Sequence, residues 1–216
     1  MIKDDEYGLA VKNTDMLMRE IPPRMAGTML LWTVQQVEYF TFREVIQMII
    51  WINGAFGVGK TSVAENLSKK LQNSYIYDPE NAGGFIWNNT PASMSRKGDF
   101  QDIPLWRIIN RHMLSYIIKC SDVDLIIPMT MVNKAYYNEI INDVSEAKLT
   151  IWHFILTAPR DTIVKRLLGR GESQDSWAVR QMDRCIKGLA DMDGIFIDTE
   201  NRSIDNITDI IIRRIS

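Results

Sequence analysis

This 216-residue chain has few cysteines and a small net charge, and each of these facts excludes a class of site or partner. The two cysteines, Cys120 and Cys185, lie too far apart in sequence to build a disulfide framework or a zinc site. Such cysteine usage fits a reducing compartment, and we expect the protein to be cytoplasmic. The formal net charge is -2 and the isoelectric point about 5.8. Because no basic field attracts nucleic acid, we expect no nucleic-acid partner.

Long hydrophobic runs are missing from the sequence as well. The stretch 25–34 comes nearest, but it is much shorter than the roughly 20 apolar residues that span a bilayer. It also follows charged and proline-rich residues, unlike a signal peptide. The sequence therefore does not support membrane association. With 46% hydrophobic residues, the chain has enough apolar material for a sizeable core.

Residues 1–47 differ from the rest of the chain and contain no motif. Pro22 and Pro23 break any helix that would run through them. Met48 then directly precedes the first convincing strand. We therefore predict a working domain over 48–216, with 1–47 as an N-terminal appendage or an upstream reading of the gene.

From Met48 onward, short apolar runs alternate with helical patterns. Near-continuous apolar runs predict strands at 49–52, 74–78, 124–129, 150–158 and 194–199. Apolar residues at helical spacing predict helices at 61–72, 104–120, 135–147, 160–170, 177–190 and 203–215. This alternation is typical of an α/β protein whose parallel sheet is covered by helices on both faces.

The stretch after the first strand carries the strongest motif. Gly54, Gly59, Lys60 and Thr61 have the spacing G-x-x-x-x-G-K-[ST], which is the P-loop pattern. Its glycines let backbone N–H groups at a helix N-terminus surround an anion, and its lysine adds positive charge at the β- and γ-phosphates. We predict that this stretch binds a nucleoside triphosphate, with Thr61 holding Mg²⁺. The candidate binding residues are Gly54, Ala55, Phe56, Gly57, Val58, Gly59, Lys60, Thr61 and Ser62.

Asp78, at the end of the second predicted strand, is the candidate catalytic base. Ligands collect at the carboxyl ends of parallel strands, so Asp78 should lie near the terminal phosphate. There it could accept a proton from an attacking hydroxyl or assist Mg²⁺ through a water molecule. The alternative is a turn or helix cap before Pro79. Because Pro128 and Met129 stand where a Walker B acid often holds magnesium, Asp78, Glu80 or water must do more of that work.

The stretch 79–106 reads as a polar loop containing Phe85, Trp87, Phe100 and Trp106. These rings could form an acceptor pocket that stacks a base or covers an acyl chain, or they could pack into the core. Arg96 and Lys97 are its few positive charges, which argues against a strongly anionic acceptor.

Arginines in two helical regions are further candidates for the phosphate site. Arg107 could point at an anionic group near the phosphates. A flap over 165–184, hinged at glycines, could bring Arg166, Arg170 or Arg180 onto the transferring phosphoryl group. The alternative is an ordinary solvated face. Our candidate catalytic residues are Lys60, Asp78, Arg107, Arg170 and Arg180.

Six segments in order resemble the bacterial tunicamycin-resistance family across about residues 48–210. They are MIIWINGAFGVGKT, YIYDPE, DFQDIPLWR, LIIPMT, YYNEII and SWAVRQMDRC. The resemblance implies a P-loop NTPase fold with strand order 2-3-1-4-5, similar to nucleoside-monophosphate kinases and antibiotic kinases. In the similar chloramphenicol phosphotransferases an Asp after the second strand acts as base, and this position corresponds to Asp78. The resemblance to the tunicamycin-resistance family also implies protection against tunicamycin, a nucleoside antibiotic with an acyl tail.

Three functions remain open on the sequence alone. The leading one is an ATP-dependent kinase that phosphorylates a small-molecule acceptor such as tunicamycin. The second is a protein that binds ATP and sequesters an amphiphilic drug without transfer. The third is a metabolic kinase acting on a nucleotide or a shikimate-like acid.

Overall fold

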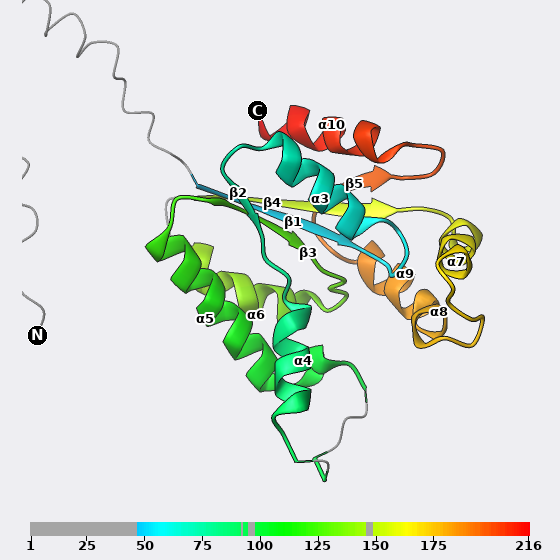
Figure 1. The fold of residues 1–216 in the computed structure, drawn as a ribbon, viewed down its shortest axis with the longest axis horizontal. Helices are drawn as coiled ribbons and strands as arrows, with labels where there is room; N and C mark the ends of the chain where they lie inside the picture. The colour runs from blue at the N-terminus through cyan, green and yellow to red at the C-terminus, as the bar shows by residue number, and fades with distance from the viewer. Residues whose placement is uncertain (1–46, 92, 95–97, 146–148) are drawn as a thin grey trace, which may run out of the picture. The chain divides into compact units, whose positions relative to one another are not determined.

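A computed structural model describes residues 47–91, 93–94, 98–145 and 149–216 (Figure 1). The predicted appendage lies outside these residues except for Gln47, so its status stays a prediction. Gln47 itself begins the first strand, two residues before the strand expected from the sequence. Arg96 and Lys97 also lie outside the described residues.

Five parallel strands form a single sheet in the order β2-β3-β1-β4-β5, which confirms the predicted topology. The strands are β1 (Gln47–Gly54), β2 (Ser74–Ile76), β3 (Asp124–Pro128), β4 (Leu149–Thr157) and β5 (Ile195–Asp198). Because the central strands are covered on both faces, their sequences are apolar throughout rather than alternating.

Helices cover both faces of the sheet, as the sequence predicted. In Figure 1, α3 and α10 lie on one face, and α5 and α6 lie on the other. The helices are α3 (Lys60–Lys70), α4 (Glu80–Asn88), α5 (Pro104–Cys120), α6 (Lys134–Ser145), α7 (Arg160–Gly169), α8 (Trp177–Arg180), α9 (Met182–Ala190) and α10 (Ile204–Ile215), with a 3-10 turn η1 at Phe100–Asp102. Within the described ranges, no helix is both long and apolar enough to cross a membrane.

Two elements differ from the sequence prediction. The expected loop 79–106 contains helix α4. The sequence did not predict this helix because Gly83 and Gly84 lower its helix propensity. Gly83 is needed for packing, since a Cβ there would lie 2.8 Å from Cγ of Phe100. The expected helix 177–190 is instead divided into α8 and α9 at Gln181, whose N–H bonds the carbonyl oxygens of both Trp177 and Val179.

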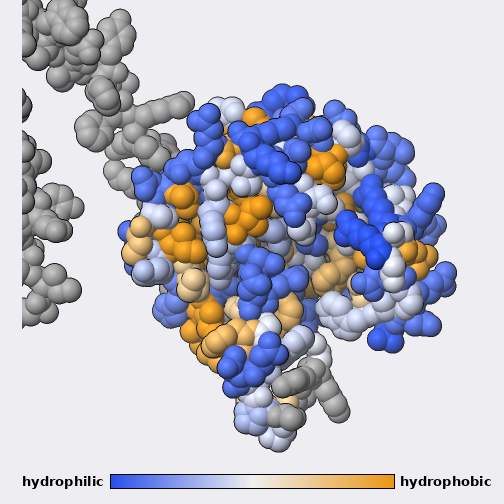
Figure 2. All heavy atoms as spheres, viewed as in Figure 1, coloured by the Kyte–Doolittle hydropathy of each residue, from blue (hydrophilic) through white to orange (hydrophobic). Residues whose placement is uncertain are grey.

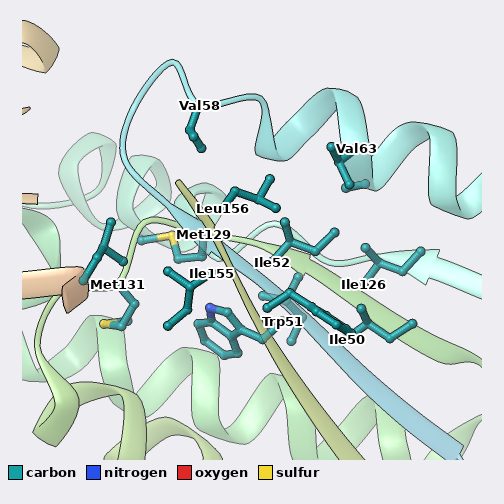
Figure 3. Close-up of a cluster of buried hydrophobic side chains, with 14 of the residues drawn as sticks. Ile50, Trp51, Ile52, Val58, Val63, Ile126, Met129, Met131, Ile155 and Leu156 are labelled. Atoms are coloured by element: carbon teal, nitrogen blue, oxygen red, sulfur yellow. The ribbon is translucent and has the colours of Figure 1, made fainter. Parts of the chain in front are cut away.

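The core lies on both sides of β1. Ile50, Trp51 and Ile52 are fully buried in consecutive positions, and their side chains alternate between the two faces. Figure 3 shows Trp51 on the opposite side of β1 from Val63 of helix α3. This double-sided packing holds the carboxyl ends of the strands in place, and Figure 1 shows these ends facing α7 and α8.

A buried polar network joins β1 to the segment after β3. Oδ1 of Asn53 accepts hydrogen bonds from the N–H groups of Gly54 and Met131, each at 2.8 Å. Its Nδ2 donates to the Met131 carbonyl at 2.8 Å and lies 3.1 Å from Nε2 of His153. Because Asn53 presents its amide N–H to His153, Nε2 must be the acceptor and the imidazole is neutral with its hydrogen on Nδ1.

This network makes stability sensitive to acid through His153. Burial lowers the pKa of His153 from 6.5 to about 4, against a smaller opposing effect of Asp193. The unfolded chain therefore takes up a proton near pH 6.5 while the folded protein does not. Stability is fully retained above that pH and lost as the pH falls toward 4, by about 3 kcal/mol in all.

Thermal or urea unfolding of the full chain between pH 7.5 and 4 measures this loss. We expect His153→Gln to start from a lower stability at pH 7.5 and to lose less of it on acidification. His112→Gln is the matched control, because His112 is exposed on α5 and should leave the acid loss intact. Equal acid loss in wild type and His153→Gln would contradict the burial of a neutral imidazole.

Candidate active site

The turn between β1 and α3 has the backbone geometry of a phosphate cradle. Gly54, Gly57 and Gly59 all have positive φ angles, of 149°, 82° and 112°. Gly57 also has no room for a side chain, since a Cβ would lie 2.7 Å from Cγ of Leu167 on α7. The turn is therefore packed directly against α7 and needs glycine for both conformation and space.

The start of helix α3 is arranged to receive an anion. Its N-cap is Gly59, which supplies no capping side chain, and its first turn contains no acidic residue. The N–H groups of that turn are thus left for a ligand, and the helix dipole favours negative charge there.

A cavity of about 220 Å³ lies at this position. Of the nine predicted binding residues, Phe56, Gly57, Gly59, Lys60 and Thr61 line it. The side chains of Ala55 and Val58 are buried in the core instead, so these residues can offer only backbone groups. Gly54 shapes the turn, and Ser62 is not part of the cavity wall.

Lys60 is buried at the base of this cavity. Its Nζ donates to the carbonyl oxygen of Ala55 at 3.1 Å and lies 5.5 Å from the centre of the Phe56 ring. Burial lowers the pKa of Lys60 from 10.5 to about 8, although Glu80 and Asp78 act in the opposite direction. A lysine with so few partners is held ready for an anionic ligand, which would restore its usual pKa.

Two carboxylates face Lys60 from the end of β2 and the start of α4. Asp78 and Glu80 both line the cavity. Oδ1 of Asp78 accepts the N–H of Glu80 at 2.9 Å, so Asp78 makes a turn at the start of α4 and also faces the cradle. Partial burial raises the pKa of Glu80, and the nearby carboxylates of Asp78 and Asp99 raise it further. Pro128 completes this wall at the end of β3, where the sequence offers no Walker B acid.

The segment after α7 covers the opposite side of the cavity. Arg170 and Glu172 line it, together with Ala178 of α8. The ring of Trp177 packs edge-on against Phe56 with a centroid distance of 4.9 Å. The structure therefore places Arg170 at the cradle, together with Lys60, Thr61 and Asp78.

Solved structures with this geometry include a tunicamycin resistance protein from Deinococcus radiodurans. It has a TM-score of 0.65 and 28% sequence identity, and the match covers 79% of this chain and 96% of that chain. The resemblance to the tunicamycin-resistance family is confirmed. No family model matches the chain, and no curated protein matches it.

Kinases with lower identity are also similar to this chain in fold. A sugar kinase from Janibacter has a TM-score of 0.56 at 14% identity, covering 78% of this chain and 93% of that chain. An APS kinase from Mycobacterium tuberculosis, solved with AMPPNP and APS, has a TM-score of 0.55 at 16% identity, with 79% and 98% covered. These matches establish a P-loop kinase-like α/β fold.

The other arginines that the sequence suggested for the phosphate site do not line the cradle. Arg180 is exposed on α8. Arg166 donates to the Val58 carbonyl at 3.2 Å and to Oγ1 and the carbonyl of Thr199, each at 2.9 Å. It thereby fixes the P-loop backbone to the segment after β5, and it acts as a positioning residue in this structure.

Arg107 lies elsewhere than the sequence suggested. Its Nε donates to Glu139 at 2.7 Å, its Nη1 donates to the Gln101 carbonyl at 2.6 Å, and it lies over the Tyr136 ring at 4.1 Å. A guanidinium that is committed to α6 and η1 in this way does not point at the phosphates. The sequence pattern placed Arg107 on a helix but did not identify the residues that it contacts.

The sequence analysis missed two charged groups, Glu172, which lines the cavity, and Asp99. The carboxylate of Asp99 is buried and accepts from Arg184 of α9 at 3.3 Å and from the N–H of Gln101 at 3.2 Å. This ion pair connects α9 to the segment that follows α4. An Asp before an aromatic residue in an apparent loop gives no signal of such burial.

Proposed function

We propose that the chain is an ATP-dependent phosphotransferase that phosphorylates a hydroxyl group of a small-molecule acceptor, with tunicamycin as the first candidate. The observation that carries this proposal is the composition of the cradle wall. Lys60, Thr61 and Arg170 surround the space for a terminal phosphate, and Asp78 faces the same space.

The residues present suit a magnesium nucleotide. The free N–H groups at the start of α3 and the buried ammonium of Lys60 complement the β- and γ-phosphates. Among the described residues no group of three or more His, Cys, Asp or Glu side chains could hold a metal by itself. This suits Mg²⁺, which is commonly bound by one or two protein oxygens together with substrate phosphates. Thr61 would hold it, with Asp78 acting through water, and the ion would neutralise phosphate charge.

The chemistry follows from these positions. Asp78 accepts the proton of the acceptor hydroxyl, whose oxygen forms a bond to the γ-phosphorus of ATP. The bond between that phosphorus and the β–γ bridging oxygen breaks, and ADP leaves with the electron pair. Lys60 and Arg170 stabilise the negative charge that moves onto the bridging oxygen. The proton on Asp78 passes to solvent after the product leaves.

Tunicamycin is proposed because of the relative from Deinococcus radiodurans, which is named a tunicamycin resistance protein. Its identity to this chain is 28%, whereas the kinases compared above stand at 14% and 16%. Transfer to the drug would explain resistance through modification rather than through binding alone.

Mass spectrometry of the full chain incubated with Mg-ATP and tunicamycin tests the proposal. We expect a drug species heavier by one phosphoryl group, absent with Lys60→Ala. Lys69→Ala is the matched control, because Lys69 is an exposed lysine on the same helix α3 and should leave transfer intact. An unmodified drug that nevertheless raises the melting temperature in the presence of ATP would overturn transfer and establish sequestration.

A further inference from the structure

A second cavity of about 550 Å³ lies beside the cradle, between β2, α4 and α5. Its walls are mostly apolar, and the residues that matter here are Tyr75, Ile76, Phe85, Met113 and Ile117. We call it the α4–α5 groove.

The groove keeps large apolar side chains in contact with solvent. Phe85 is 62% exposed, Tyr75 55% and Met113 41%. Figure 2 shows hydrophobic side chains gathered on the face where α4 and α5 lie. Contiguous exposed apolar surface of this kind commonly marks a binding site.

Phe85 differs in this respect from the other three rings of its segment. Trp87, Phe100 and Trp106 pack on one another with centroid distances of 5.6 and 5.3 Å. Trp106 is fully buried, and its Nε1 donates to the Pro79 carbonyl at 2.9 Å. Of the four rings in 79–106, three therefore pack together and stabilise the domain, as one of the two alternatives predicted. Phe85 alone lines the groove, where it could contact an acceptor.

Asp78 lines both the groove and the cradle. Asp78 therefore lies where the groove borders the proposed site of phosphoryl transfer. Among the described residues, Asp78 is the one charged side chain that lines the groove, and none of the lining residues is a lysine or an arginine. The Tyr77 hydroxyl is already engaged with Oδ1 of Asn110 at 2.6 Å. An anionic ligand would be repelled here, whereas a neutral apolar one would not.

We infer that the α4–α5 groove binds the apolar part of a neutral, hydroxylated acceptor and places its hydroxyl group at Asp78. This inference rests on the proposed phosphotransferase function and specifies its substrate class as an uncharged amphiphile. The acceptor would be selected by burial of its apolar part in the groove on one side of Asp78. On the other side, its hydroxyl group would have to reach the terminal phosphate in the cradle.

A series of alkyl glucosides, from methyl to octyl and below their micelle concentrations, tests the inference with the full chain. Each added methylene that enters the groove should raise kcat/KM about two- to fourfold, since complete burial of one methylene corresponds to about fourfold. The change should appear in KM, because the alkyl chain binds equally in the ground state and the transition state.

Phe85→Ser and Met113→Ser should each flatten the dependence on chain length. Tyr116→Ser is the matched control, because Tyr116 is a 64% exposed ring on α5 that does not line the groove. All three side chains are substantially exposed, so folding should be retained, and a melting curve checks this.

Equilibrium binding of octyl glucoside without ATP separates failure of this inference from failure of the proposed function. Transfer that is independent of chain length would overturn the groove as the acceptor site and leave the phosphotransferase standing. Binding that strengthens with chain length and is lost in Phe85→Ser, without transfer to the glucosides or to tunicamycin, would support the groove and overturn the phosphotransferase. Absence of both binding and transfer would overturn the inference.

Discussion

Replacing Asp78 with Asn is expected to lower kcat for phosphoryl transfer by about 10²–10⁴-fold, the usual contribution of a positioned general base. The side chain lies on the wall shared by the cradle and the α4–α5 groove. Asn keeps the size of the side chain, and its Oδ1 can still accept the Glu80 N–H that begins α4. It removes only the capacity to take up a proton.

The affinity for ATP should change little in Asp78→Asn, because the free N–H groups of α3 and the ammonium of Lys60 remain. Single-turnover transfer and equilibrium binding of ATP measure the two effects separately. Asp198→Asn is the matched control, because Asp198 is the last residue of β5 and likewise accepts the N–H two residues on, that of Glu200, at 2.9 Å. Transfer at the wild-type rate in Asp78→Asn would remove Asp78 from the mechanism.

The fold was largely predictable because its signals are local. A half-buried strand alternates apolar and polar residues, whereas Ile49–Ile52 is apolar at every position. Such continuous runs indicate strands buried on both faces of a parallel sheet. The P-loop spacing fixes a strand before it and a helix after it. Strand order then followed from resemblance rather than from the residues alone.

The candidate site was less predictable because its geometry depends on packing. The sequence could not show that α4 forms despite Gly83 and Gly84, since the compensating contact with Phe100 is distant in sequence. It could not show that Arg107 faces Glu139, because a charge pattern on one helix does not identify its partner helix. Arg180 and Arg184 are four residues apart, but the division at Gln181 puts them on different helices.

Asn53 illustrates a signal that was present but not interpreted. Asn is disfavoured in strands, and here it is the penultimate residue of β1, within the buried part of that strand. Its side chain forms the bonds that hold Gly54 and Met131 together, and so it fixes the entry to the P-loop. A polar residue inside an apolar run is therefore informative even where it contacts no ligand.

Lys60→Met is expected to lower kcat for phosphoryl transfer by about 10²–10³-fold, which is the usual effect of removing one preorganised electrostatic group. The wild-type protein should in addition bind ATP with a characteristic pH dependence. Because the pKa of Lys60 is lowered to about 8 in the free protein, the ammonium is charged below that pH and neutral above it. Bound phosphates stabilise the charged form, so binding takes up a proton.

The affinity of the wild type for ATP should consequently fall as the pH rises through 8, by up to about tenfold per pH unit. Lys60→Met should bind ATP more weakly at neutral pH and show no such fall. Lys69→Met, on the exposed face of the same helix, should behave as the wild type. Titration calorimetry in buffers of different ionisation enthalpy detects the proton directly. An ATP affinity that is constant from pH 7 to pH 9 in the wild type would mean that Lys60 is already fully charged before the nucleotide arrives.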